Sequence, residues 1–364
     1  MLSSASAWAG VPTLEIKGFG TAGLVRADTP SFFLPEYGTF GQRPTFSPNT
    51  RFGLNVSSNL SDGWTVASQF IAENVNLGYT VSLDWGFVSY QPIPELALRG
   101  GRLIISTWLF SQQIKVGYSY LWVRPPVEVY SLLGGFTNIN GASILSHLPL
   151  GGGELSTEVY SGLEDEKTYT NNPASPTSTD IRITDLIGVD LNYSYKDIWT
   201  VHASYLQARV VATAYSQAPV AGPIFGTVNT PLDLHLGRFF SVGGKMDYNN
   251  FIFITEVARR LIDGQALQTA SAWYATLGYR ISKITPYLSY AWQGSLSGSF
   301  YVHPDAPTVT TLKKELYSYL VGVNAQVNDS VILKAEWEPA FYKFIDSTKD
   351  FRANIASVSA NFIF

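Results

Sequence analysis

The residue types that most often carry chemistry are sparse and scattered in this chain. Its four histidines, His147, His202, His235 and His303, lie far apart and show no metal-binding spacing such as H-E-x-x-H. A G-x-S-x-G nucleophile turn is absent, and without cysteine there is no thiol catalysis, disulfide or thiolate metal site. We therefore expect no enzymatic activity, no metal and no cofactor. His202 lies between two apolar residues of an alternating segment, so its ring is expected to face water.

The other candidate functional residues are charged side chains at the polar positions of segments in which polar and apolar residues alternate. If the opposite phase faced lipid, an arginine or lysine near the bilayer midplane would cost ~2–4 kcal/mol there. We therefore expect these charged side chains to point inward, toward water, or to sit near a rim. They are Glu15, Lys17, Arg51, Glu73, Asp84, Lys245, Asp247, Glu256, Arg260, Arg280, Lys334, Glu336 and Glu338.

The composition favours strands that separate lipid from water. Charged residues make up 14% of the chain, against roughly 25% in soluble domains, and aromatic residues make up another 14%. No run of about 18 apolar residues occurs, which excludes a membrane-spanning helix. The mean hydropathy is +0.06, so apolar residues are not gathered in blocks. A net charge of −4 argues against a nucleic-acid partner. A soluble β-sandwich or propeller is the alternative.

Alternation of apolar and polar residues recurs along the chain and predicts strands. In one segment, Val81, Leu83, Trp85 and Phe87 are expected to share a single face. Similar alternation occurs in 52–56, 187–193 and 331–337. Tryptophan and tyrosine cluster near the predicted strand ends, as in the aromatic girdles of membrane barrels.

Short and long connections alternate between these strands. Short turns are predicted at Leu60–Gly63, Pro92–Glu95, Pro149–Gly153, Tyr195–Ile198, Tyr248–Asn250, Ile281–Ile284 and Val327–Ser330. Longer segments are predicted at Arg26–Thr50, Asn74–Thr80, Ser106–Thr137, Leu163–Ile183, Ala212–Leu236, Ile262–Thr269, Ser295–Leu312 and Lys343–Asp350. The pattern predicts an all-β, antiparallel, up-and-down transmembrane barrel of about sixteen strands of about ten residues each. Its short turns would be periplasmic, and its long loops extracellular.

The two ends of the chain carry different signals. Ala7-Trp8-Ala9 fits a signal-peptidase site, so residues 1–9 are either the remnant of an export signal or an ordinary disordered terminus. The barrel would then comprise residues 10–364. The last strand alternates and ends on Phe364, where an exposed aromatic edge would favour aggregation in a soluble protein.

Three stretches resemble the sixteen-stranded trimeric porins of Gram-negative outer membranes. They are Asn59–Trp64, similar to the first periplasmic turn of such porins, the Gly-Arg strand Glu95–Arg102, and the terminal Phe364. The resemblance covers residues 12–364 and implies a homotrimer in the cell outer membrane. It also implies that Ser106–Thr137 folds into the barrel as a constriction loop. The stretch Trp122–Tyr130 is unlike the acidic constriction loops of general porins, so the solute is left open.

On this resemblance, the candidate constriction residues are Arg102, Lys115, Arg124 and Glu128, because charge rings set selectivity in narrow pores. Arg124 could instead pair with Glu128 and pin the loop to the wall. Adjacent prolines at 125 and 126 would stiffen the loop. A β-bulge at Gly100-Gly101 would turn Arg102 inward.

Three functions remain open at this stage. The first is a water-filled porin for passive diffusion of small hydrophilic solutes and ions, surrounded by outer-membrane lipid and lipopolysaccharide. The second is a selective channel of the same fold, for anions or small organic acids, which the basic residues Arg102, Lys115 and Arg124 suggest. The third is a structural or adhesion barrel without an open pore, with Thr168–Asp180 as a contact surface. The acidic run Glu164–Glu166 could bind divalent cations, or it could be a solvated loop face.

Overall fold

The computed structural model describes most of the chain. The described residues are 13–30, 32–34, 38–75, 78–133, 136–170, 177–221, 224–262, 269–295, 300–303, 306–311, 314–344 and 350–364. The predicted signal-peptide remnant at residues 1–9 lies outside these residues, as does part of the predicted contact surface Thr168–Asp180.

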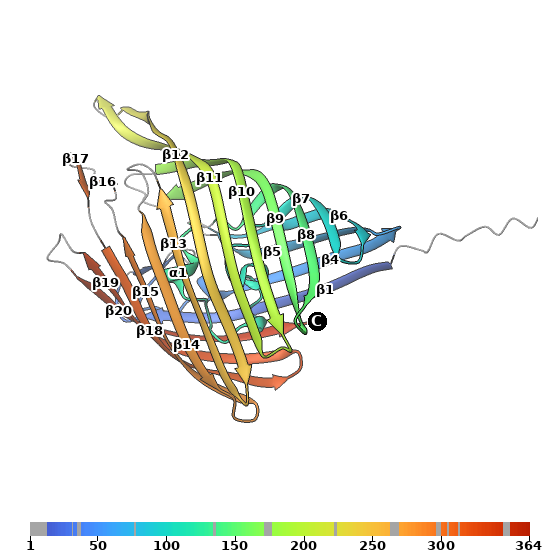
Figure 1. Ribbon diagram of the computed structural model, residues 1–364. Helices are drawn as coiled ribbons and strands as arrows, with labels where there is room; N and C mark the ends of the chain where they lie inside the picture. Colours follow the sequence, from blue (N-terminus) through green and yellow to red (C-terminus); the bar gives the residue numbers. More distant parts are fainter. Residues whose placement is uncertain are drawn as a thin grey trace, which may run out of the picture.

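Within the described ranges, sixteen antiparallel strands close into one barrel, as predicted (Figure 1). The barrel strands are β1 (Thr13–Ala27), β4 (Arg51–Ser61), β5 (Trp64–Val75), β6 (Gly78–Ile93), β7 (Leu96–Ile104), β8 (Asn138–Leu150), β9 (Gly153–Thr170), β10 (Thr177–Tyr195), β11 (Trp199–Ala221), β12 (Ile224–Tyr248), β13 (Phe251–Ile262), β14 (Ala270–Tyr279), β15 (Ile284–Ser295), β18 (Lys314–Asn328), β19 (Val331–Phe344) and β20 (Phe351–Ile363). Each strand pairs with its neighbour in the chain order, and β1 pairs with β20 to close the ring.

Short elements lie in the connections. Two small hairpins are formed by β2 (Phe32–Leu34) with β3 (Gly38–Phe40) and by β16 (Phe300–His303) with β17 (Ala306–Thr311). The helical turns are η1 (Ser47–Asn49), η2 (Ser111–Gln113), η3 (Gly117–Ser119) and α1 (Val127–Tyr130). Among the described residues, no helix is long and apolar enough to cross a membrane.

The seven predicted short turns are all present at one end of the barrel. Several need left-handed backbone: Asp62 and Gly63 have φ values of 49° and 84°, and Asn249 and Asn250 have 47° and 70°. Asp, Asn and Gly are the residues that adopt this conformation most readily, which makes such turns recognisable in a sequence. At this same end, the backbone of the last residue, Phe364, forms two hydrogen bonds with the backbone of Gly18.

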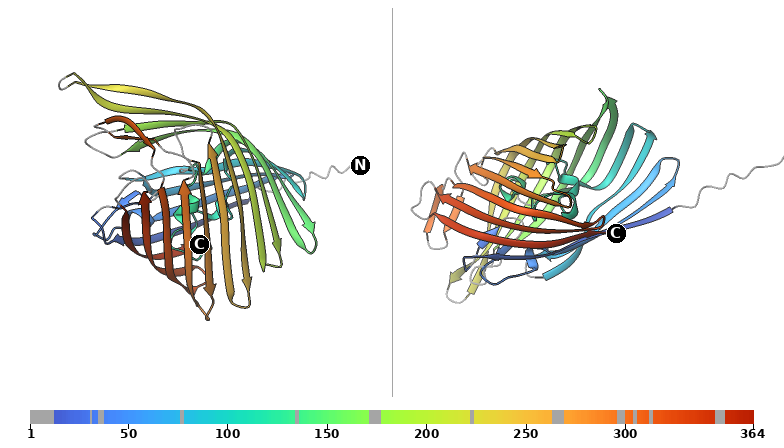
Figure 2. Two further views of the ribbon diagram at one scale, coloured as in Figure 1. Left: turned by 60° about the vertical axis from the view of Figure 1, so that its left-hand side comes forward. Right: turned by 90° about the horizontal axis from the view of Figure 1, so that it is seen from below.

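The opposite end differs from the prediction in three connections. The segments Asn74–Thr80, Leu163–Ile183 and Ala212–Leu236 were predicted as loops but are mostly strand, because the flanking strands continue to pair. Strands β11 and β12 reach 23 and 25 residues, well beyond the ~10 that cross a bilayer, and project from the barrel (Figures 1 and 2). Paired backbone satisfies its own hydrogen bonds, so a hairpin can continue above a membrane.

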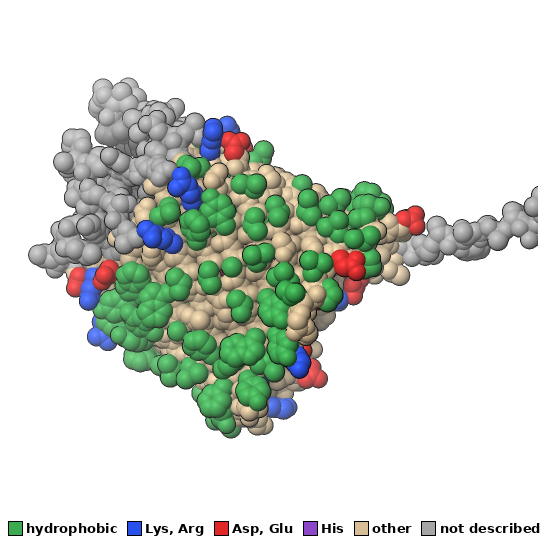
Figure 3. All heavy atoms as spheres, in the orientation of Figure 1, with side chains coloured by type: hydrophobic (Ala, Val, Ile, Leu, Met, Phe, Trp, Pro, Cys, Tyr) green, Lys and Arg blue, Asp and Glu red, His purple; other side chains and the backbone are tan. Residues whose placement is uncertain are grey.

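The outer wall of the barrel is a membrane-facing surface. Along β13, β15 and β18 the outward side chains are apolar and exposed, for example Val257 at 57%, Leu288 at 58% and Val321 at 53%. Figure 3 shows hydrophobic side chains across the middle of the described wall and charged ones along its borders. Exposing so wide an apolar surface to water would be unfavourable, but such a surface matches the lipid-facing belt of a transmembrane barrel.

One β-bulge changes which side chains face the interior. On β5, Gln69 pairs with Trp85 and Phe70 pairs with Leu83, so Asp84 is the extra residue. The prediction that Val81, Leu83, Trp85 and Phe87 share one face is therefore wrong. Leu83 faces outward, whereas Trp85 faces inward beside Gln69. The predicted bulge at Gly100-Gly101 is absent, since the register of β7 against β6 runs through it without a shift.

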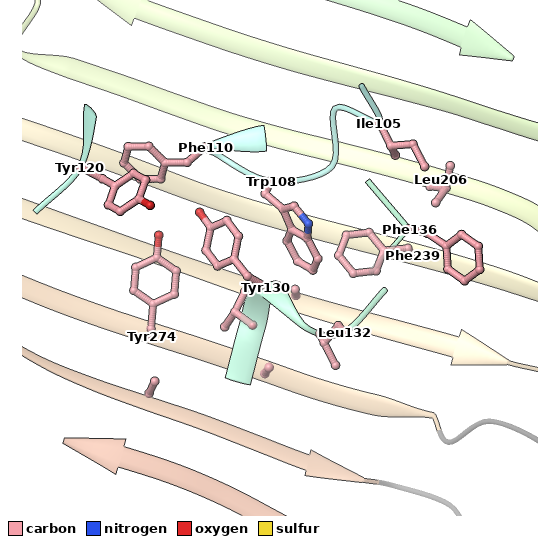
Figure 4. Packing of buried hydrophobic residues seen from close by; sticks show 14 of the residues in the cluster. Ile105, Trp108, Phe110, Tyr120, Tyr130, Leu132, Phe136, Leu206, Phe239 and Tyr274 are labelled. Carbon is pink, nitrogen blue, oxygen red and sulfur yellow. The ribbon is translucent and has the colours of Figure 1, made fainter. Parts of the chain in front are cut away.

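The lumen contains its own apolar core. The described part of the connection between β7 and β8, residues 105–133 and 136–137, lies inside the ring of strands and is here called the inner loop (Figure 2). Trp108 of this loop packs edge-on against Phe239 of β12, and Tyr130 lies between Trp108 and Tyr274 of β14 (Figure 4). These rings are fully or almost fully buried, so the inner loop fills one side of the barrel.

Candidate pore constriction

A buried lysine of the barrel wall holds the middle of the inner loop. Lys334 of β19 is 3% exposed, and its Nζ donates hydrogen bonds to the carbonyl oxygens of Gly117, Tyr120 and Trp122 at 2.5, 2.6 and 2.7 Å. The same ammonium lies 4.5 Å from the centre of the Tyr120 ring. Three carbonyl dipoles and one aromatic face replace the water that this charge has lost.

Next along the loop, a buried arginine reaches back to the wall. Arg124 pairs with Glu338 at 2.8 Å and donates to Ser357 Oγ at 2.9 Å. The sequence suggested Glu128 as its partner, but the guanidinium instead bridges β19 and β20. This pair is almost fully buried, and removing one member would leave an uncompensated charge.

Glu128 therefore lies in the barrel interior, and none of the described basic side chains forms an ion pair with it. It is 1% exposed, and although Ser318 lies close by, neither carboxylate oxygen accepts a well-formed hydrogen bond. Burial, followed by the nearby negative charge of Glu338, raises the pKa of Glu128 to about 7. The helix α1 thus places a carboxyl group that is half protonated near neutral pH against the wall.

The start of the inner loop is fixed by a buried polar cluster. Glu256 of β13 accepts hydrogen bonds from the Leu109 N–H and the Tyr130 hydroxyl, both at 3.0 Å. His202 lies 3.8 Å from Glu256 through Nδ1 and 2.6 Å from Asp190 through Nε2. His202 was expected to face water. It has the inward phase, but its side chain is completely buried beside Asp190 and Glu256.

Further wall residues contact the inner loop, and together these contacts are here called the seat of the loop. The Thr107 carbonyl accepts from Ser204 and Ser241 at 2.9 and 2.5 Å, and Trp122 Nε1 donates to Thr276 Oγ1 at 3.0 Å. Arg260 donates to the Leu132 carbonyl, and Glu336 accepts from the Val123 N–H at 3.4 Å. Many of the inward charges predicted on the wall thus bind the loop rather than line open water.

The side of the inner loop that faces β4–β6 is different, because its side chains stay partly exposed. Lys115 pairs with Glu73 at 2.5 Å, and Arg51 lies 3.9 Å from the same carboxylate. Lys115, Glu73 and Arg51 are 23%, 21% and 13% exposed. Gln112 is also exposed, and Asp84 accepts from Gln69 at 2.7 Å on the same wall. A small cavity here is lined by Gln69, Asp84, Ser111, Gln112, Lys115 and Asn138, among others.

The other predicted residues lie away from this stretch. Arg102 has the opposite phase to the buried, inward-facing Leu103 and pairs with Glu164 at 2.9 Å on the long-connection side of the barrel. Glu15 and Lys17 pair with each other at 2.7 Å, largely exposed, near the short-turn end of β1.

The last two basic wall residues also lie toward the short-turn end. Arg280 pairs with Asp247 at 2.7 Å, and Lys245 is partly exposed on the inward phase of β12. Within the described ranges, no three His, Asp or Glu side chains form a cluster that could hold a metal ion. The predicted acidic run is divided between ion pairs, Glu164 with Arg102 and Asp165 with Arg182.

Sequence reasoning missed Glu158, Asp190 and the burial of His202. Glu158 pairs with Arg99 at 2.5 Å and accepts from Ser106 of the inner loop. Both acids lie on the polar phase of their strands, so alternation could have found them. The sequence predicted an inner loop but not which wall residues it would contact, because that depends on contacts between distant parts of the chain.

Comparison with solved structures shows the same fold. OmpT of Vibrio cholerae is 12% identical, covers 99% of both chains and gives a TM-score of 0.60. The outer membrane channel DcaP of Acinetobacter baumannii is 12% identical over 97% of each chain, with a TM-score of 0.59. Salmonella typhi OmpF is 12% identical over 96% of this chain and 97% of its own, with a TM-score of 0.54. No protein-family model and no curated protein matches the sequence. The chain therefore has the fold of the sixteen-stranded outer-membrane porins.

Proposed function

We propose that the protein is a channel of the Gram-negative outer membrane through which small hydrophilic solutes and ions diffuse passively. The path would run along β4–β6, beside the exposed face of the inner loop. The observation that carries this proposal is the partly exposed group formed by Lys115, Glu73 and Arg51, next to a loop that is largely buried in the lumen. Because the loop fills the other side, the channel would be narrow.

The ion pairing of the basic residues favours weak rather than strong ion selectivity. Arg102, Lys115 and Arg124 were the set that suggested an anion channel. Each of them forms an ion pair with a glutamate, so their charge is balanced where it stands. A homotrimer is part of the proposal, supported by the shared fold alone. We also propose that the protein has no catalytic activity.

The test is single-channel recording of the purified protein in a planar bilayer, with the reversal potential measured under a salt gradient. We expect small conductance steps that close in threes, with a reversal potential near zero. Gln112→Trp should reduce each step because the larger side chain enters the passage, whereas Gln91→Trp, at the short-turn end of β6, should not. Wild-type protein that is folded but does not conduct would reject the channel and favour a structural barrel. A strong anion-selective potential would favour the selective alternative.

A further inference from the structure

Three arginines lie on adjacent strands at the border of the apolar belt. Arg209 is on β11, Arg238 on β12 and Arg259 on β13. Each is next to a buried, inward-facing residue in its strand, so each side chain belongs to the outer face. Figure 3 shows basic side chains in a row along the border of the described apolar surface.

The strand register makes these arginines diagonal neighbours. Arg209 pairs with a residue two positions before Arg238, and Arg238 pairs with a residue two positions after Arg259. Such diagonal neighbours on a sheet are about 7–8 Å apart at Cα. Strands of membrane barrels tilt by about 35–45° from the barrel axis, so a row with this stagger runs close to the membrane plane. The three guanidinium groups therefore lie at a similar depth.

The residues next to the row fix that depth as the headgroup level. Toward the short-turn end, the outer face continues with Phe240, Val242 and Val257, which are exposed and apolar. An arginine costs ~2–4 kcal/mol at the bilayer midplane but only about 0–1 kcal/mol near the interface. Asp185 lies 3.4 Å from Arg209 with both side chains about two-thirds exposed, a pair weak enough for a stronger anion to replace.

We propose that this arginine row binds the phosphate groups of lipid A, the phosphorylated glucosamine anchor of lipopolysaccharide, while acyl chains lie on Phe240, Val242 and Val257. Guanidinium groups bind phosphate oxygens in pairs, and a row of three at one depth matches an anion that carries more than one phosphate. The inference rests on the outer-membrane setting proposed above, because it places the long-connection end of the barrel in the leaflet that contains lipid A.

The experiment measures lipid binding to the purified full-length protein in detergent by native mass spectrometry. The probes are bisphosphorylated lipid A and, separately, phosphatidylglycerol, titrated over the same concentrations. The variant is Arg209→Gln/Arg238→Gln/Arg259→Gln, which keeps polar side chains of similar length. The control variant, Lys196→Gln/Lys283→Gln, removes exposed positive charge from the short-turn end. Gel mobility before and after heating verifies that every variant is folded.

We expect the triple variant to bind lipid A at least tenfold more weakly, and the control to bind as the wild type does. Unchanged binding by the folded triple variant would overturn the inference, and so would wild-type affinity for phosphatidylglycerol equal to that for lipid A. The conductance of the triple variant should equal that of the wild type, since the row lies outside the lumen. Lipid A binding by a barrel that does not conduct would reject the channel while supporting the lipid site.

Discussion

Replacing Lys334 by methionine should release the inner loop from the wall. The substitution keeps an unbranched side chain but removes the ammonium that donates to Gly117, Tyr120 and Trp122. Hydrogen bonds to a charged group contribute about 1.5–3 kcal/mol each, and three would give a gross value of roughly 4.5–9 kcal/mol. Removing the buried charge also recovers a desolvation cost of several kcal/mol. We therefore expect a net loss of about 3 kcal/mol in the stability of the seated loop.

The natural absence of cysteine provides a direct assay of this loss. Leu121→Cys places a single thiol at a residue that is 9% exposed and packs close to Gly278 of β14. A membrane-impermeant maleimide would react with it only when the loop leaves its seat. A change of 3 kcal/mol corresponds to about a hundredfold in that equilibrium, so labelling should accelerate by about this factor in the Lys334→Met background.

Lys245→Met is the matched control, because Lys245 lies on the inward phase of β12 and is partly exposed. It should leave the labelling rate of Leu121→Cys unchanged. If Lys334→Met remained folded and changed the labelling rate by less than twofold, the three carbonyl contacts would not stabilise the seat, and the reasoning would be refuted. Single-channel recordings of the same variant should show larger or noisier steps for the same reason.

Three other predictions follow from single sites. Because the pKa of Glu128 is about 7 in the fold and near 4.5 when exposed, the folded state binds more protons between these values, so stability should fall by about 3 kcal/mol as pH rises from 4.5 to 7. Urea midpoints should show this slope in the wild type and a shallower slope in Glu128→Gln. Glu73→Gln removes the counter-charge of Lys115 and should move the reversal potential toward anion selectivity, and no shift would place the path elsewhere. Gly188→Val would put a side chain where a buried ring of β9 lies and should cost ~1–3 kcal/mol in heat-unfolding assays, whereas Gly100→Val, with nothing within 4 Å, should not.

The fold was predictable because its signals are local. Alternation with period two, turn residues such as Asp62-Gly63, and the difference in length between the two kinds of connection are all visible within a few residues. The strand count and the turn positions follow from them. A bulge is harder to see, because one extra residue such as Asp84 leaves the composition of the strand unchanged and alters only its phase.

The candidate site was less predictable because its contacts are distant in the chain. Arg124 had one acidic neighbour in its own segment, Glu128, but binds Glu338, 214 positions away. Burial decides between such partners, and burial inside the barrel depends on how the inner loop folds against strands that follow it in the chain. The types of residue on the wall were therefore identified from the sequence, while their partners were not.

Different charged residues determine the width of the passage and its ion selectivity. Lys334 and Arg124 are buried, and each has several partners, so they fix where the inner loop lies. Lys115 and Glu73 are partly exposed and face the remaining space, where water and ions compete for them. Substitutions in the first pair should change the size of the conductance steps and leave the ion preference almost unaltered. Substitutions in the second pair should change the reversal potential at nearly constant step size, because the loop would remain seated.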